Sequence, residues 1–221
     1  MGRARDSEAT RAALIAAAGE LFAAHGFTGV TARQVAARAG VALSAIPYHF
    51  GSMETLYREV LLAACDVAAE AQHLAEQARA ADPAEGLRLA IRWVITDLSA
   101  QTAAWPVRLI ERECLDPSPT FREVVQRRFK PEWDWLAAVI GRASGQPADD
   151  EAVHFAVMTM YTLASSLLTR QRLMAELSPT VADRVTSPDF VEVLAGITLD
   201  TVARYRAVFS RPPRPTSRRK R

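Results

Sequence analysis

Residues 31–50, TARQVAARAGVALSAIPYHF, predict two short helices joined by a tight turn. The first helix begins with a capping box, in which the Thr31 hydroxyl and the Gln34 amide satisfy backbone N–H groups that a helix start leaves without partners. It ends before Gly40, which supplies the turn, and the second helix runs to Phe50. Four apolar positions can lock the pair at a sharp angle: Val35, Ala39, Val41 and Ile46. This is the spacing of a helix-turn-helix.

Pro47 decides where the second short helix begins. If the helix began at Leu43, Pro47 would lie in its interior and remove a hydrogen bond. If Ser44 is the N-cap, Pro47 is only the third helical residue, where its missing N–H does no harm. We prefer the later start.

A longer helix precedes the motif, over about residues 8–24. Its apolar side chains share one face: Leu14, Ile15, Ala18, Leu21 and Phe22. The pattern stops at His25-Gly26, because glycine readily adopts the left-handed conformation that closes a helix.

Capping residues and prolines divide the rest of the chain into further helices. We expect them from Ser52 to about 80, from Pro83 to about 100, over about 104–114, from Ser118-Pro119 to just before Ser144-Gly145, from Asp149 or Asp150 to about 176, and from Ser187-Pro188 to about 209. Alanine and arginine favour helices, and β-branched residues seldom alternate, so we expect almost no strand. The sequence predicts an all-α protein.

The composition is typical of a soluble globular protein. Of its 221 residues, 49% are apolar, which is enough for a normal core. No stretch approaches the ~18 apolar residues of a membrane span, and the N-terminus lacks the apolar core of a secretory signal. The cysteines, Cys65 and Cys114, are too few for a zinc cluster or a disulfide framework. We expect a cytoplasmic protein with reduced, buried thiols.

Basic charge is concentrated at the C-terminal end. The formal net charge is +2, but the tail from Ser210 to Arg221 contains six basic residues and no acidic one. Prolines and repelling charges cannot pack, so we expect a disordered tail. It is a solvated end, a nonspecific anchor on DNA, or both.

In a helix-turn-helix, the second short helix enters the major groove of double-stranded DNA and its exposed side chains meet base edges. The candidates here are Leu43, Ser44, Ala45, Pro47, Tyr48 and His49. At the positive N-terminus of the preceding helix, Thr31 and Arg33 are candidates for phosphate contacts, and Gln34 is predicted to lie at the DNA with them.

The segment from Arg11 to Tyr57 resembles the N-terminal DNA-binding domain of the TetR family of transcriptional regulators. The match covers Leu21-Phe22, Gly26-Phe27, Thr31, Val35-Ala36, Ala39-Gly40-Val41, His49-Phe50 and Glu54-Leu56. Three residues depart from the family pattern: Ala42 replaces a small polar cap, Pro47 a tyrosine and Met53 a lysine. Because Met53 cannot donate to phosphate, other contacts must replace that lysine, such as Arg3, Arg5, Arg33 or the tail.

A later stretch, Trp105–Glu113 followed by Asp116–Pro119, looks like the C-terminal domain of regulators related to CecR and CerR. The resemblance implies a DNA-binding domain at 1–52, a helical ligand-binding and dimerisation domain at 53–209, and the basic tail at 210–221. It implies a homodimer formed by the helix over about 149–176 and the last helix. The long helix from Ser52 would act as a rigid lever between the domains.

The resemblance further implies a repressor that leaves a pseudo-palindromic operator when a small hydrophobic inducer binds. The candidate ligand-binding residues are Trp105, Arg108, Glu111, Trp133, His154, Met158 and Tyr161. Aromatic walls with a few polar anchors are typical of such pockets. No catalytic residue, cofactor or metal is predicted.

A di-iron helical-bundle enzyme is the alternative from another class. Glu70 with His73 and Glu151 with His154 have the spacing that places two metal ligands on one helical face. Such a site also needs a glutamate from each of two other helices, and Glu151 lies in a first turn, where acids are common. We therefore prefer the regulator.

Overall fold

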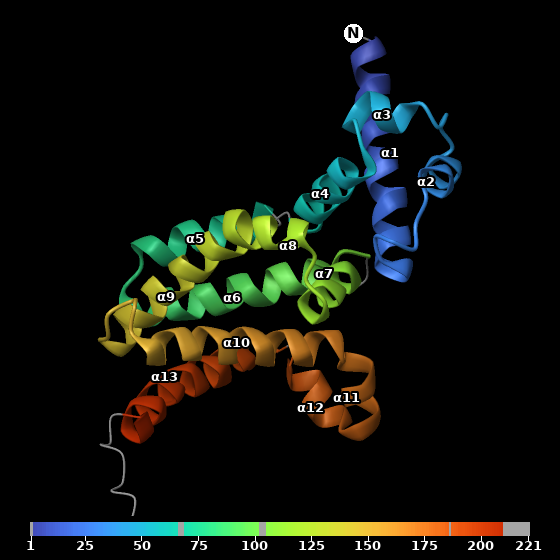
Figure 1. The fold of residues 1–221 in the computed structure, drawn as a ribbon. Coiled ribbons are helices and arrows are strands. Elements are labelled where there is room, and N and C mark those ends of the chain that lie inside the picture. The colour runs from blue at the N-terminus through green and yellow to red at the C-terminus, as the bar shows by residue number, and fades with distance from the viewer. Residues whose placement is uncertain (1, 66–68, 102–104, 186, 210–221) are drawn as a thin grey trace, which may run out of the picture. The chain divides into compact units, whose positions relative to one another are not determined.

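The computed structural model describes residues 2–65, 69–101, 105–185 and 187–209 (Figure 1). Every regular element in these ranges is a helix, which confirms the all-α prediction. By their contacts the residues form two compact units, 1–68 with 99–132 and 69–98 with 133–221. The tail at 210–221, predicted to be disordered, lies outside the described residues.

The first unit contains the predicted helix-turn-helix. Its elements are α1 (Gly2–His25), α2 (Ala32–Ala39), α3 (Ala45–Phe50), α4 (Met53–Ala64), α7 (Trp105–Leu115), α8 (Pro119–Val124) and the π-helix η1 (Val125–Phe129). Helix α1 contacts α2, α3, α4 and α7, and α4 also contacts α7 and α8. Helix α1 starts at Gly2 rather than near residue 8, because the arginines and alanine that follow Gly2 are good helix formers.

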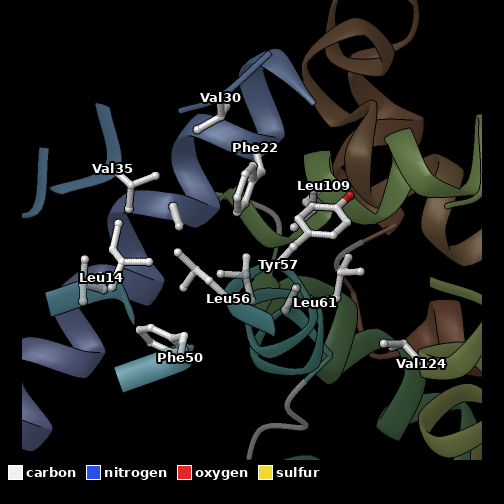
Figure 2. Packing of buried hydrophobic residues seen from close by; sticks show 14 of the residues in the cluster. Leu14, Phe22, Val30, Val35, Phe50, Leu56, Tyr57, Leu61, Leu109 and Val124 are labelled. Carbon is white, nitrogen blue, oxygen red and sulfur yellow. The ribbon is translucent and has the colours of Figure 1, made fainter. Parts of the chain in front are cut away.

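Large apolar side chains from these helices share one core (Figure 2). The fully buried ones include Leu14, Phe22, Val35, Leu56, Leu61 and Leu109. The Phe22 ring meets the Tyr57 ring edge to face, with 4.8 Å between centroids. Because α4 and α7 contribute to this core, helices outside the helix-turn-helix fix its position.

The second unit is a bundle built mainly from long helices. Its elements are α5 (Ala69–Ala80), α6 (Pro83–Gln101), α9 (Lys130–Ser144), α10 (Glu151–Thr169), α11 (Gln171–Leu177), α12 (Pro179–Val185) and α13 (Asp189–Phe209), with the C-terminal end of α6 and the first residues of α9 assigned to the first unit. Helix α10 packs against α13. Two predicted caps are confirmed: Asp82 Oδ1 accepts the Ala84 N–H at 3.0 Å, and Asp150 Oδ1 accepts the Ala152 N–H at 2.9 Å. The start expected at Ser187-Pro188 is wrong, because α13 begins at Asp189 and the Ser187 hydroxyl instead donates to the Arg184 carbonyl at 2.7 Å.

The single long helix expected from Ser52 to about 80 is wrong. Helix α4 ends at Ala64, and Cys65 leaves the helical conformation with φ −103° and ψ 7°. The sequence there has no glycine or proline, so no helix-breaking residue marks this end. The expectation that this helix acts as one rigid lever is therefore also wrong. Cys65 is buried as expected, but Cys114 is exposed, because it follows the buried Glu113 near the end of α7.

The helix expected from Asp150 to about 176 is interrupted at Arg170. The Thr169 hydroxyl donates to the Ser165 carbonyl at 2.8 Å, a side-chain bond that bends helices. The chain continues in α11, which lies within the helix expected to reach about 176, and in α12, which is not among the expected helices. The helix expected from Ser118-Pro119 does begin there, with the Ser118 hydroxyl accepting the Phe121 N–H at 3.1 Å, but it contains the π-helical turn η1.

Helix α10, with 19 residues, is long and apolar enough to cross a membrane by length and composition alone. The sequence expectation that no stretch approaches this composition was therefore too strict. The core helix of a soluble protein has the same properties, and α10 packs along α13.

Candidate functional site

The turn between α2 and α3 is built as the sequence predicts. The Thr31 N–H donates to Gln34 Oε1 at 2.8 Å, and the Gln34 N–H donates to the Thr31 hydroxyl at 3.3 Å, which completes the capping box. Gly40 closes α2 with φ +68°, and its N–H donates to the Ala36 and Ala37 carbonyls. A Cβ on Gly40 would meet no atom within 4 Å, so the left-handed backbone alone requires glycine here.

Helix α3 begins at Ala45, which makes Pro47 its third residue and confirms the later start. Ser44 precedes the helix, but its side chain makes no capping hydrogen bond. Its carbonyl accepts the Tyr48 N–H at 3.2 Å. Ile46 and Phe50 are buried, so the opposite side of α3 is turned to solvent.

Most of the predicted DNA-binding side chains are exposed, on α3, at the start of α2 and just before α3. Tyr48 is 78% exposed and Leu43 48% exposed. The other exposed candidates are Thr31, Arg33, Gln34, Ser44 and Pro47, whereas Ala45 and His49 are half-buried. The Tyr48 ring stands edge to face against the His49 ring, with 4.9 Å between centroids. The Gln34 side-chain carbonyl is already used by the capping box.

One ion pair joins the helix-turn-helix to α1, and a second joins α1 to α4. The Arg38 guanidinium, in the last turn of α2, donates to the Glu20 carboxylate, with 2.6 Å from Nε to Oε2. Arg11 pairs with Glu59 of α4 at 2.5 Å and also lies over the Phe50 ring, 5.4 Å from its centroid. These arginines are therefore engaged within the protein, while Arg33 has no ion pair among the described residues.

Sequence reasoning missed a buried polar network between α4, α7 and α8. The Tyr57 hydroxyl donates to Glu113 Oε1, and Oε2 of the same carboxylate accepts the Ser118 N–H at 2.9 Å and the Ser118 hydroxyl at 2.8 Å. Tyr57 and Glu113 are 2% and 4% exposed, and burial together with the Glu113 carboxylate raises the pKa of Tyr57. One feature of the sequence could have indicated that Glu113 is buried. It lies four residues after Leu109, about one helical turn along α7, and Leu109 is a core residue.

The candidate ligand-binding residues are divided between the two units. Trp105, Arg108 and Glu111 lie on α7 in the first unit, where Trp105 is half-buried and the other two are exposed. Trp105 packs against the core of that unit. Trp133, His154, Met158 and Tyr161 lie in the second unit.

Within the second unit, the structure brings Trp133 and His154 together. The Trp133 indole N–H donates to His154 Nδ1 at 2.7 Å, and the two rings are inclined by only 12°. Met158 is 47% exposed and Tyr161 is half-buried. A second aromatic pair, Trp93 with Trp135, has 5.1 Å between centroids.

The di-iron alternative has no support in the described part of the chain. His154 already accepts a hydrogen bond from Trp133, and the Glu151 carboxylate accepts one from the Tyr205 hydroxyl. His73 pairs with Gln77 at 3.0 Å, while nothing is described for the Glu70 side chain. Among the described residues, no three histidine, cysteine, aspartate or glutamate side chains come together as a metal site.

Two protein-family models match the chain. The model of bacterial regulatory proteins of the TetR family matches residues 14–60, and the model of the C-terminal domain of the HTH-type transcriptional dual regulator CecR matches residues 83–199. No curated protein matches the sequence.

Solved structures of transcriptional regulators have a similar fold. HlyIIR, a hemolysin II transcriptional regulator, is 17% identical with a TM-score of 0.59, over 82% of this chain and 99% of that one. A putative transcriptional regulator from Pseudomonas aeruginosa PAO1 is 18% identical with a TM-score of 0.58, over 89% and 93%. AibR, solved in complex with isovaleryl coenzyme A and operator DNA, is 20% identical with a TM-score of 0.55, over 71% and 86%.

Proposed function

Since the chain belongs to the TetR family of transcriptional regulators and has a CecR-type C-terminal domain, we propose that it is a repressor that binds its operator as a homodimer and leaves it when a small hydrophobic molecule binds. The exposed side of α3 is the observation that carries the DNA-binding role. A short helix with two buried anchors, an exposed aromatic residue and a capped helix before it is the arrangement that enters a major groove. The family is one of regulators rather than enzymes, and we assign this chain no catalytic role.

The exposed side chains of α3 give the test of this role. Tyr48→Ala and His49→Ala should each weaken specific operator binding by roughly 1–3 kcal/mol, as the loss of a base or backbone contact commonly does. Fluorescence anisotropy with labelled operator measures the change. Leu177→Ala, at a residue of α11 that is 70% exposed, is the matched control and should bind normally. Normal operator affinity in both α3 variants would show that another surface reads the DNA.

An exposed apolar face on α10 and α13 supports the homodimer. Phe155 of α10 is 40% exposed, and Val193 and Ile197 of α13 are 53% and 36% exposed. The Phe155 ring lies 4.9 Å from the Tyr205 ring of α13, so the face is continuous across the two helices. A second copy would cover it across a two-fold axis, and duplication of the recognition helix matches a pseudo-palindromic operator.

The inducer role rests on the aromatic residues of the second unit. Trp133 and His154 form a hydrogen-bonded pair, and we propose that they bind the inducer together with Met158 and Tyr161. AibR was solved with both an acyl coenzyme A and operator DNA, which supports a ligand-responsive regulator of this fold. For Trp105, Arg108 and Glu111, contact with a ligand stays a prediction.

His154→Ala should keep operator affinity but raise the inducer concentration that releases half of the operator by about tenfold or more, because truncating a hot-spot residue of a binding site costs about 2 kcal/mol or more. The measurement is a screen of hydrophobic metabolites and antibiotics for release of labelled operator, repeated on the variant with each active compound. His73→Ala, at an exposed histidine of α5, is the matched control. Release by metal ions or chelators alone would overturn the hydrophobic-inducer proposal.

Three further assignments belong to the same proposal. The DNA-binding domain occupies residues 1–52 and the ligand-binding and dimerisation domain residues 53–209. The protein acts in the cytoplasm, where the operator lies. The basic tail at 210–221 adds electrostatic attraction to DNA if it contacts phosphates, which would appear as a steeper dependence of affinity on salt.

A further inference from the structure

Helix α7 approaches α1 closely at two points. A Cβ built on Gly19 would lie 2.4 Å from the Trp105 ring, and one built on Gly26 would lie 2.7 Å from the Arg112 guanidinium. Gly19 and Gly26 are seven residues apart, and so are their partners Trp105 and Arg112, a spacing of about two helical turns. Helix α7 therefore runs beside α1 in the same direction, and the Trp105 ring occupies the space that a side chain at position 19 would fill.

This contact joins regions that match two different family models. Gly19 lies in the TetR-type region at 14–60, and Trp105 lies in the CecR-type region at 83–199. In the structure, both belong to the first unit. A helix of the C-terminal family domain is thus packed into the core that supports the helix-turn-helix, where Leu109 of α7 is fully buried.

The contact point on α1 is next to the residue that holds α2. Glu20 follows Gly19 and binds the Arg38 guanidinium in the last turn of α2. Arg38 precedes the Gly40 turn that leads into α3. A displacement of α1 at Gly19 would therefore move the end of α2 and the start of the recognition helix, because the ion pair and the shared core link them.

Helix α7 is also held to α4 by a buried hydrogen bond. The Glu113 carboxylate accepts the hydrogen bond of the buried Tyr57 hydroxyl, and its second oxygen is bound by Ser118 at the start of α8. Helix α7 consequently has a defined position between α1 and α4, from which a bulky ring at position 105 can set the position of α1.

We propose that Trp105 is a positioning residue for operator binding: its ring, seated on Gly19, sets the position of α1 and, through Glu20 and Arg38, the presentation of α2 and α3 to DNA. The inference rests on the proposed operator binding. It gives Trp105 a role different from ligand contact, and it makes operator affinity sensitive to the position of α7.

A pair of complementary substitutions tests the contact. Gly19→Ala places a methyl group against the ring and should weaken operator binding about tenfold, since overpacking shifts the elements that carry it. Trp105→Leu, which frees space without a clash, should weaken binding severalfold. The double variant should bind more tightly than Gly19→Ala alone, because the smaller side chain at 105 accommodates the new methyl group. Ala16→Ser adds one heavy atom to an exposed position of α1 and is the control.

Operator affinity is measured by anisotropy at a temperature at which circular dichroism shows each variant to be folded. If the Gly19→Ala variant does not fold, the operator affinity of the Trp105→Leu variant alone tests the positioning role. Wild-type affinity in Gly19→Ala, or no recovery in the double variant, would overturn the positioning role. Trp105→Leu with wild-type operator affinity but no inducer response would overturn it in favour of ligand contact. Failure of the wild-type protein to select any operator would instead refute the proposed function itself.

Discussion

Replacing Ile197 by glutamate should convert the protein into a monomer and weaken operator binding by about 10²–10⁴-fold. Ile197 lies on the exposed apolar face shared by α10 and α13, next to Val193. A buried charge at that position would be repelled by its copy across the two-fold axis. The affinity loss follows because each recognition helix would then bind its half-site without the effective concentration that its partner supplies.

Light scattering gives the mass of this variant, and anisotropy with the full operator gives its affinity. Leu177→Glu introduces the same charge at a more exposed apolar residue on α11 and should remain dimeric. A dimeric Ile197→Glu variant with normal operator affinity would show that α10 and α13 do not form the interface.

Replacing Phe22 by alanine should destabilise the first unit by about 3–5 kcal/mol, the range observed for truncation of large buried aromatic residues. Phe22 is fully buried, and its ring contacts the rings of Tyr57 and Phe27 at 4.8 and 5.9 Å between centroids. The cavity would lie where α1, α4 and the turn after α1 meet, so operator binding should fail at temperatures at which the wild-type protein still binds.

Urea denaturation followed by circular dichroism measures the change in the free energy of unfolding. Leu173→Ala, at an apolar residue of α11 that is 52% exposed, should change stability by no more than about 0.5 kcal/mol. A loss below about 1 kcal/mol in Phe22→Ala would mean that the core around α1 collapses to fill the space, and that α1 is less firmly fixed than its burial indicates.

Features that depend on neighbouring residues were predictable from the sequence. The capping box of Thr31 and Gln34, the left-handed Gly40 and the position of Pro47 in α3 follow from local backbone chemistry. The caps at Asp82 and Asp150 belong to the same group, since they act within three residues. These local rules were sufficient to locate the recognition helix.

Features that depend on distant contacts were not predictable. Cys65 ends α4 without any helix-breaking residue, and Glu113 is buried because Tyr57, fifty-six residues earlier, donates to it. Trp105 was predicted from its chemistry as a ligand residue, but its neighbour Gly19 is far away in the sequence. A single sequence shows that glycine is present at position 19, and only the packing shows which side chain requires it.

Selection of bound sequences from a random pool of double-stranded DNA tests the central claim most directly. A dimer that reads DNA with α3 should enrich a pseudo-palindrome whose half-sites are centred about one or more helical turns apart, roughly 10 bp or a multiple. The selected duplex should bind at least about 10³-fold more tightly than a scrambled one at the same salt concentration. Enrichment of no sequence, or of a single unrepeated site bound by a monomer, would contradict the account.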